Sequence, residues 1–498
     1  MTKVLVLGGG LGGLISATSL AEVGFDVTLV EASDRYGGKA GSYFINGRWW
    51  DHGWHGFPAF YFNLRGWLQK LGITLVDFDA SVFVDKLPAG GMANAKKLFL
   101  PKNPFNPLED LKMIFSGVLP PAQMLLYLRF LTWAMGQVLK KNAELDRIGR
   151  TALMRGQWYI TQEILDLDTD SMLKGTAVAS SDMSAMTWQN VMRNWGRTPS
   201  PFMSVLPGPM QTTFIDPLVA YAQQKGVKMS LNERATAIRV SGNRISSVDT
   251  VDANQVTHTY TPDALVSAIP PEHLRPMASW DLMQADTITS TLWQLRTVPM
   301  GSVHLALKTK RTDIPKDPVF LKGGKWGLSF VDMSQLVPNP PPTTELSVVV
   351  ALSANLQSLS EADQFTAIMD ELAQFTGITA SDVQEYHVIP NVVAPLTIND
   401  IASWQYRPKP RSKTVGNLFF ACDWAKSPYD LMGMESATYA AMMAAQALAA
   451  DHGKTLPTPV KAPQYPRWLM SLVATLMWPV LPPAYLWARI VEGAHPPK

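Results

Sequence analysis

The first thirty residues follow a strand–helix–strand pattern. Residues 4–7 and 26–30 are short runs of apolar, β-favouring side chains. Between them, residues 14–23 place apolar side chains at helical spacing, and Gly24 ends that pattern. A glycine-rich turn at residues 8–13 joins the first strand to the helix. The pattern therefore predicts a β–α–β unit of an α/β protein.

Later segments repeat these kinds of element. Apolar runs at residues 227–231, 263–269 and 417–421 predict buried strands. The second of these runs ends at a proline turn, Pro270 and Pro271. An alanine-rich stretch begins at residue 434, shortly after the third run, and predicts a helix through residue 450.

The part of the chain between the last two blocks predicts strands around one helix. Segments 302–307 and 345–352 alternate or run apolar, as strands do. Ser360 can cap a helix over residues 361–375, and the proline-rich segment 337–342 predicts a loop. We interpret this part as the sheet of a substrate domain.

Two apolar stretches predict contact with a membrane surface. The first, 113–139, contains a predicted helix at 123–139. The second, 468–488, has 21 residues without a charge, but prolines interrupt it. The helix that can form there, 468–478, is too short to cross a bilayer. Its neighbourhood holds the aromatic residues that favour the membrane interface: Trp468, Trp478, Tyr485 and Trp487. We interpret both stretches as monotopic surface elements, with ordinary core helices as the alternative.

Length, composition and charge indicate the number of domains and exclude some partners. With 498 residues, the chain is long enough for two or three domains. Hydrophobic residues make up 47% and charged residues 17%, which leaves apolar surface to spare beyond a large core. Net charge is +2 and no basic run is interleaved with aromatics, so nucleic acid is not an expected partner. We expect no signal peptide and a cytoplasmic, peripherally membrane-associated protein.

Metal chemistry is not expected either. The single cysteine, Cys422, excludes a disulfide within the chain and a metal site built on cysteines. No His, Asp and Glu cluster has metal-ligand spacing, and neither a nucleophile elbow nor a phosphate-binding loop of the GxxxxGK type is present. A small buried side chain is the interpretation we favour for Cys422 over a redox thiol.

The glycine turn carries the strongest chemical signal. Gly8 permits the tight turn, Gly10 allows a pyrophosphate to approach the backbone, and Gly13 lets the helix pack on the strand. The helix N-terminus supplies N–H groups for phosphates, and Glu31 at the end of the next strand can bind a ribose. This context predicts a site for the ADP half of a dinucleotide, and the alternative is an ordinary glycine-rich turn of an α/β protein. The expected binding residues are Gly8, Gly10, Leu11, Gly12, Gly13, Glu31 and Ala32.

The segment 34–42, which reads DRYGGKAGS, resembles the flavin amine oxidase and carotenoid desaturase superfamily. In that superfamily such a segment follows the ribose acid and wraps the pyrophosphate and flavin. The resemblance implies FAD as cofactor. It adds five binding residues: Arg35, Gly37, Gly38, Lys39 and Ala40. The alternative for Arg35 is a solvated charge on the surface.

The resemblance continues in two later blocks. Asp423 matches the acid that binds the ribityl chain, and the helix that follows would face the flavin with Met434, Glu435, Ser436 and Ala437. Ala235 matches a residue that touches the adenine end through its backbone. Relatives usually have glycine where this chain has Cys422, Ser436 and Ala441, which puts the close backbone approach at Ser436 in doubt.

These blocks imply an α/β fold: a discontinuous Rossmann-type FAD-binding domain plus an α+β substrate domain with membrane-facing helices. The FAD-binding domain would comprise residues 1–85, 205–290 and 400–455. The substrate domain would comprise 86–204 and 291–399, and residues 456–498 would form an apolar, membrane-associating tail.

One segment indicates a branch of the superfamily. Residues 49–57, together with the block from 204 to 218, resemble plant-type phytoene and zeta-carotene desaturases. The resemblance places Gly53 and His55 beside the flavin. His55 is a candidate catalytic base, and the alternative, which we favour, is a histidine that hydrogen-bonds backbone near the flavin.

The resemblance implies a desaturase in which flavin N5 accepts a hydride from a long hydrophobic isoprenoid, a carotenoid precursor. A membrane surface would be a partner, and a quinone or oxygen would take the electrons. The alternatives are a flavin amine oxidase, an FAD-dependent carotenoid isomerase or squalene-type dehydroxylase, and a flavin-bearing subunit without turnover.

Overall fold

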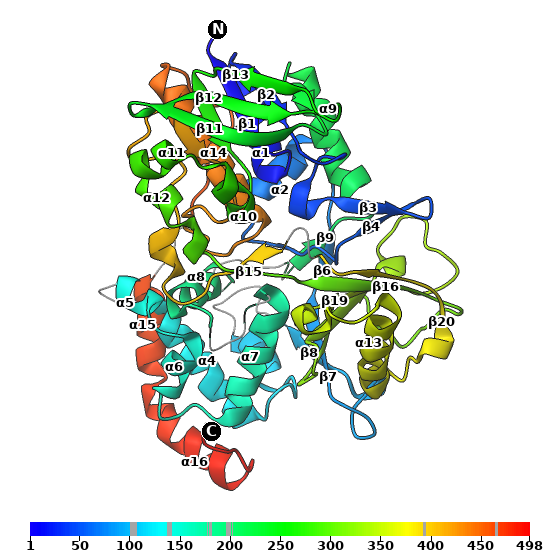
Figure 1. The fold of residues 1–498 in the computed structure, drawn as a ribbon. Helices are drawn as coiled ribbons and strands as arrows, with labels where there is room; N and C mark the ends of the chain where they lie inside the picture. The colour runs from blue at the N-terminus through cyan, green and yellow to red at the C-terminus, as the bar shows by residue number, and fades with distance from the viewer. Residues whose placement is uncertain are drawn as a thin grey trace.

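Five parallel strands form a sheet at one end of the molecule (Figure 1). The computed structural model describes residues 1–99, 107–136, 142–176, 178, 182–195, 201, 203–391, 395–463 and 467–498. In order across the sheet, the strands are β10 (Lys228–Ser230), β2 (Asp26–Val30), β1 (Lys3–Leu7), β14 (Ala264–Ser267) and β22 (Leu418–Phe420). All neighbouring strands are parallel, so their carboxyl ends meet at one edge. The strands predicted from five separate segments are thereby confirmed.

Two helices cover this sheet side by side. They are α1 (Leu11–Ala21) and α14 (Met434–Asp451), and α14 follows its predicted bounds closely. Helix α1 begins three residues before the predicted start at residue 14. This first turn packs closely: a Cβ on Gly12 would collide with the Ala421 carbonyl oxygen beyond β22. Only glycine fits at position 12.

An antiparallel sheet lies against the same end of the molecule. It is formed by β11 (Arg234–Ser241), β12 (Arg244–Val251) and β13 (Thr257–Tyr260). The remaining smaller elements are α2 (Phe62–Lys70), α9 (Asp216–Gln224), α10 (Pro271–Leu274), α11 (Trp280–Ala285), α12 (Thr287–Ser290), β3 (Ser42–Ile45), β4 (Arg48–Asp51), β5 (Phe57–Pro58), β6 (Val76–Phe78), β9 (Met203–Val205), β15 (Thr297–Val298) and β21 (Leu396–Thr397).

A second large sheet fills the lower right of Figure 1. In order across it, the strands are β20 (Val383–Ile389), β16 (Gly301–Leu307), β19 (Glu345–Val350), β18 (Leu328–Asp332), β17 (Val319–Leu321), β7 (Ala80–Val84) and β8 (Lys96–Phe99). Helix α13 (Glu361–Thr376) packs on it, capped by Ser360, whose hydroxyl accepts from the Asp363 N–H at 3.2 Å. Strand β7 belongs here although it precedes the predicted domain boundary at residue 85, because it pairs with β17.

A group of helices fills the lower left of Figure 1. Its members are α3 (Pro107–Ile114), α4 (Pro121–Gly136), α5 (Asn142–Asp146), α6 (Arg150–Arg155), α7 (Gln162–Thr176), α8 (Ala185–Trp195), α15 (Arg467–Leu476) and α16 (Leu481–Ile490). Helices α3, α15 and α16 all pack against α4. The helix predicted over 123–139 is α4, and residues 137–139 lie outside the described part of the chain.

The C-terminal stretch differs from its prediction in one respect. Helix α15 ends at Leu476, two residues before the predicted end, and after a short 3-10 turn (Trp478–Val480) the chain becomes helical again in α16. Pro482 and Pro483 occupy the first turn of α16, where a missing N–H removes no helical hydrogen bond. Among the described residues, Arg467–Ile490 is one stretch that is long and apolar enough to cross a membrane, judged by length and composition alone.

Candidate functional site

A cavity of about 340 Å³ lies at the carboxyl edge of the parallel sheet. One side consists of the turn after β1, the second glycine segment and the loop between β22 and α14. The other side comes from the second large sheet (the substrate sheet) and from the group of helices α3–α8, α15 and α16, and it includes Val349 and Lys174. A cavity in this position is where open α/β sheets bind ligands.

The glycine turn has the backbone geometry of a phosphate cradle. Gly8 has φ +97°, which favours glycine. Gly10 precedes α1 in an extended conformation, and no side chain caps the helix. A Cβ on Gly13 would collide with the Gly8 carbonyl oxygen. The first turn of α1 therefore borders the cavity with its N–H groups uncapped by any side chain, and the helix dipole favours an anion there.

Glu31 lies on the cavity wall, directly after β2. Its Oε2 accepts from the Gly9 N–H at 2.6 Å, and its Oε1 accepts from the N–H and hydroxyl of Ser33 at 2.8 Å each. These bonds fix the carboxylate beside the glycine turn, at the position predicted to bind a ribose.

The second glycine segment lies against the first. The Gly37 N–H donates to the Gly9 carbonyl oxygen at 2.8 Å, and Gly37 has φ +114°. Gly37, Gly38, Lys39 and Ala40 all line the cavity. Arg35 does not: its guanidinium lies 3.5 Å from the Asp34 carboxylate and 4.5 Å from the centre of the Tyr43 ring.

Asp423 lines the cavity as predicted, and the charged side chains of Lys39 and Glu272 lie near it. Lys39 Nζ lies 3.5 Å from Glu272 Oε1, and both side chains are 18% exposed. Among the described residues, neither Lys39 Nζ nor the Glu272 oxygens have a hydrogen-bond partner. Burial raises the pKa of the Asp423 carboxyl, with Lys39 opposing and Glu272 adding to the shift. These polar atoms are available to hydroxyl groups of a bound molecule.

His52, Trp54 and His55 also line the cavity. His55 Nδ1 lies 3.9 Å from Asp51 Oδ2, and both ring nitrogens lack a hydrogen-bond partner within the described chain. Burial lowers the pKa of His52 to about 3, helped by the nearby His55 ring, so His52 is neutral at physiological pH. Burial works to raise the pKa of Asp51, but His55, Ser42 and the Met210 N–H together hold it below its usual value.

Seven predicted residues do not line the cavity: Gly13, Ala32, Arg35, Gly53, Ala235, Glu435 and Ser436. The Glu435 side chain was predicted to face the flavin, but it points to α2 instead. Its carboxylate accepts from the Asn63 and Leu64 N–H groups at 3.0 and 2.9 Å, so it caps α2. The Ser436 hydroxyl contacts the Ser427 hydroxyl at 3.3 Å, and Ala235 pairs with Thr250 inside the antiparallel sheet. Gly53 lies beside Val349.

The substrate side of the cavity is mostly apolar, with Lys174 and Ser329 as polar exceptions, and sequence patterns did not identify it. Its apolar residues include Trp54, Trp195, Met203, Met300, Val349 and Leu396, and Leu431 and Met432 join them from the loop before α14. Among the described residues that line the cavity, the acids are Glu31 and Asp423, both on the cofactor side. Cys422 also lines it, and burial raises the pKa of its thiol well above the usual value. A neutral, buried thiol agrees with the expected packing role.

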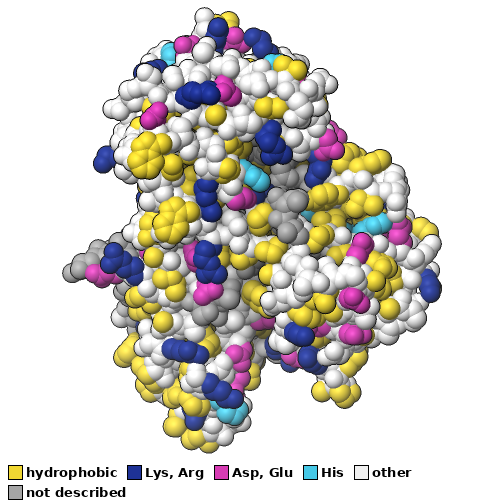
Figure 2. Space-filling model, viewed as in Figure 1, with side chains coloured by type: hydrophobic (Ala, Val, Ile, Leu, Met, Phe, Trp, Pro, Cys, Tyr) yellow, Lys and Arg dark blue, Asp and Glu magenta, His cyan; other side chains and the backbone are white. Residues whose placement is uncertain are grey.

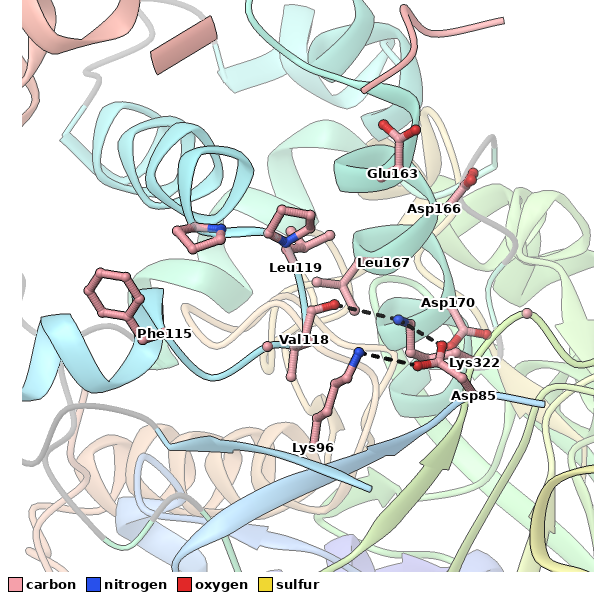
Figure 3. A pocket seen from close by; sticks show the side chains of 14 residues that line it. Asp85, Lys96, Phe115, Val118, Leu119, Glu163, Asp166, Leu167, Asp170 and Lys322 are labelled. Atoms are coloured by element: carbon pink, nitrogen blue, oxygen red, sulfur yellow. Dashed lines mark hydrogen bonds and ion pairs between the residues drawn. The ribbon is translucent and has the colours of Figure 1, made fainter. Parts of the chain in front are cut away.

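A second cavity, of about 570 Å³, lies between α7 and the substrate sheet (Figure 3). Lys322 and Lys96 reach the Asp85 carboxylate at 3.0 and 3.6 Å. Helix α7 borders both cavities, with Asp170 on this one and Lys174 on the other. The glycine turns and the α1 N-terminus line the first cavity and not this one, so the first cavity is the candidate dinucleotide site.

Comparison with known proteins agrees with this geometry. The chain belongs to the flavin-containing amine oxidoreductase family, whose profile matches residues 11–449. It is 24% identical to the zeta-carotene desaturase of Synechocystis, over 93% of this chain and 100% of that protein. It is 24% identical to the 15-cis-phytoene desaturase of Synechococcus elongatus, over 90% and 96% of the two chains.

The fold is also that of solved flavin oxidases. Cyclohexylamine oxidase from Brevibacterium oxydans superposes with a TM-score of 0.66 at 18% identity, over 91% of this chain and all of that one. The chain is thus an FAD-dependent oxidoreductase with an α/β flavoprotein fold. The glycine cradle, Glu31, and Lys39 with Asp423 on the cavity wall fit FAD.

Proposed function

We propose that this protein is a desaturase that removes hydrogen from a long, hydrophobic isoprenoid, a carotenoid precursor. The observation that carries the proposal is the similarity to two carotenoid desaturases over nearly the whole chain. The apolar substrate side of the cavity supports it, because a hydrocarbon chain needs apolar contacts and few polar ones.

FAD supplies the hydride acceptor when it is bound, and the residues of the chain hold and orient the reactants. The α1 N-terminus and Gly10 bind the pyrophosphate, Glu31 the adenine-side ribose, and Asp423 the ribityl chain. The apolar wall binds the substrate and excludes water. We assign His55 to a contact with the cofactor or substrate, since its two ring nitrogens are unpartnered in the described chain. A quinone or oxygen is the proposed electron acceptor.

An amine oxidase is the alternative that the fold itself permits. An ammonium substrate would need an acid or an electron-rich cage near the reacting carbon. The substrate side of the cavity offers no acid among the described lining residues, and its tryptophans, Trp54 and Trp195, are compatible with either substrate. The similarity to two carotenoid desaturases therefore decides for the apolar substrate.

We further propose that the protein is peripherally bound to a membrane. Large apolar side chains are exposed on α3, α15 and α16 and beside them: Leu108, Leu111, Phe115, Trp468, Leu472, Leu476, Trp478, Val480, Leu486, Trp487, Ile490 and Val491. Figure 2 shows hydrophobic side chains gathered at the lower end of this face, where Figure 1 places α15 and α16. So much exposed apolar surface is unusual for a monomer in water.

We retain the predicted domain division, with β7 added to the substrate domain.

The test is anaerobic. Holoenzyme is mixed with liposomes that contain phytoene and, in parallel, with simple amines in solution, while flavin absorbance is followed. The proposal predicts flavin bleaching with phytoene alone. Bleaching with amines alone would establish the amine oxidase. A changed phytoene isomer without bleaching would indicate an isomerase.

A further inference from the structure

Arg129 is the only charged residue of α4, and it is 5% exposed. Its Nε and Nη1 atoms are buried and have no hydrogen-bond partner among the residues that the structure describes. Buried guanidinium groups are normally paired with an acid or with carbonyl oxygens. This one is an unpaired cation in an otherwise uncharged helix.

The groups around Arg129 are aromatic. Its guanidinium lies 5.9 Å from the centre of the Trp478 ring, at the turn between α15 and α16. Tyr159 is the ionisable group that acts on its charge. One turn along the same helix, the Thr132 hydroxyl contacts the Met477 sulfur at 3.9 Å, so this face of α4 lies under the turn. Burial lowers the pKa of Arg129, in keeping with the missing counter-charge.

Aromatic contacts continue from Tyr159 to α16. Trp158 is 50% exposed, and its ring lies 5.6 Å from Tyr159 and 5.4 Å from Tyr485 of α16. Trp478 is 54% exposed. Trp and Tyr are the residues that anchor proteins at the level of the lipid headgroups. None of these residues lines the flavin cavity.

We propose that Arg129 binds the phosphate of a membrane phospholipid beside Trp478 and Tyr159, with Trp158 and Tyr485 as further aromatic residues at the same surface. This inference rests on the proposed membrane contact and names its headgroup chemistry. The planar guanidinium suits phosphate oxygens, and displacement of the half-exposed Trp478 ring would give the two buried nitrogens the partners that the described protein does not provide. The exposed apolar residues of α15 and α16 would hold the same bilayer at that depth.

The experiment compares vesicles that carry phosphate with vesicles that do not. Holoenzyme is floated with phosphatidylglycerol, phosphatidylcholine or galactolipid vesicles, without substrate, so the result does not depend on the desaturase reaction. Wild type should bind both phospholipids about tenfold more tightly than galactolipid, as expected for charge-assisted hydrogen bonds. Arg129→Met should lose that preference and keep the galactolipid binding. Arg467→Met, which removes an exposed charge at the start of α15, is the matched control and should keep it.

Thermal unfolding in lipid-free buffer separates this role from a structural one. Arg129→Met removes an unpaired buried charge, so its midpoint should equal or exceed that of wild type, with FAD content unchanged. A lower midpoint, or an undiminished phospholipid preference in Arg129→Met, would overturn the proposal. Loss of the preference on adding millimolar inorganic phosphate would overturn the lipid as the source of the phosphate.

Discussion

Gly12→Ala tests the packing that builds the cofactor cradle. A Cβ at residue 12 would collide with the Ala421 carbonyl oxygen and lie 2.9 Å from the carbonyl carbon. Both atoms belong to the backbone just after β22, so relief requires α1 or the loop before Asp423 to move. Overpacking of this kind costs about 1–3 kcal/mol, and alanine's better helix propensity returns at most about 1 kcal/mol.

Gly66→Ala is the matched control, because Gly66 lies in α2 with no atom within 4 Å of an added Cβ. It should stabilise the protein by about 0.5–1 kcal/mol. Urea unfolding, with and without added FAD, gives both values. Gly12→Ala should also weaken FAD binding, since the displaced loop carries Asp423. Equal stability and equal FAD affinity in Gly12→Ala and wild type would refute the close approach of α1 to β22.

Three further predictions concern stability and membrane binding. The folded pKa of Glu435, about 7, exceeds its ordinary value of 4.5, so its contribution is fully present below about pH 4.5 and is lost as pH rises through 7. Glu435→Gln should flatten this loss, up to about 3 kcal/mol, in urea midpoints compared across that range. Asp430→Ala should cost about 3–5 kcal/mol in unfolding free energy, because it leaves the fully buried Arg407 guanidinium without its acid; Arg407→Met with Asp430→Ala should recover part of it. Leu476→Ser with Ile490→Ser should reduce vesicle flotation and leave FAD content unchanged, since both side chains are about 70% exposed.

The cofactor side of the site could be predicted from sequence because its signals are local. The turn at Gly8 and the acid at Glu31 lie within one β–α–β unit, where spacing alone sets the geometry. The second segment, with Gly37 and Gly38, has equally fixed spacing. Asp423 was predictable from resemblance because it ends a buried strand before a helix, and parallel pairing brings that strand end to the same edge.

The substrate side depends on long-range packing that no local pattern encodes. Met203, Met300 and Val349 come from separate strands or loops and meet only when the two sheets face each other. Glu272 follows the predicted proline turn, but its pairing with Lys39 needs the fold. Glu435 shows the opposite error: its position at the start of α14 suggested the flavin, whereas its side chain caps α2.

The most direct test of the desaturase proposal is the mass of the lipid after one anaerobic turnover. Holoenzyme is incubated with phytoene-containing liposomes in the absence of any electron acceptor, and the extracted lipid is analysed by mass spectrometry. The account predicts a product lighter by two hydrogens, in an amount equal to the FAD that is reduced. Phytoene of unchanged mass beside fully reduced FAD, or beside FAD that stays oxidised, would contradict it.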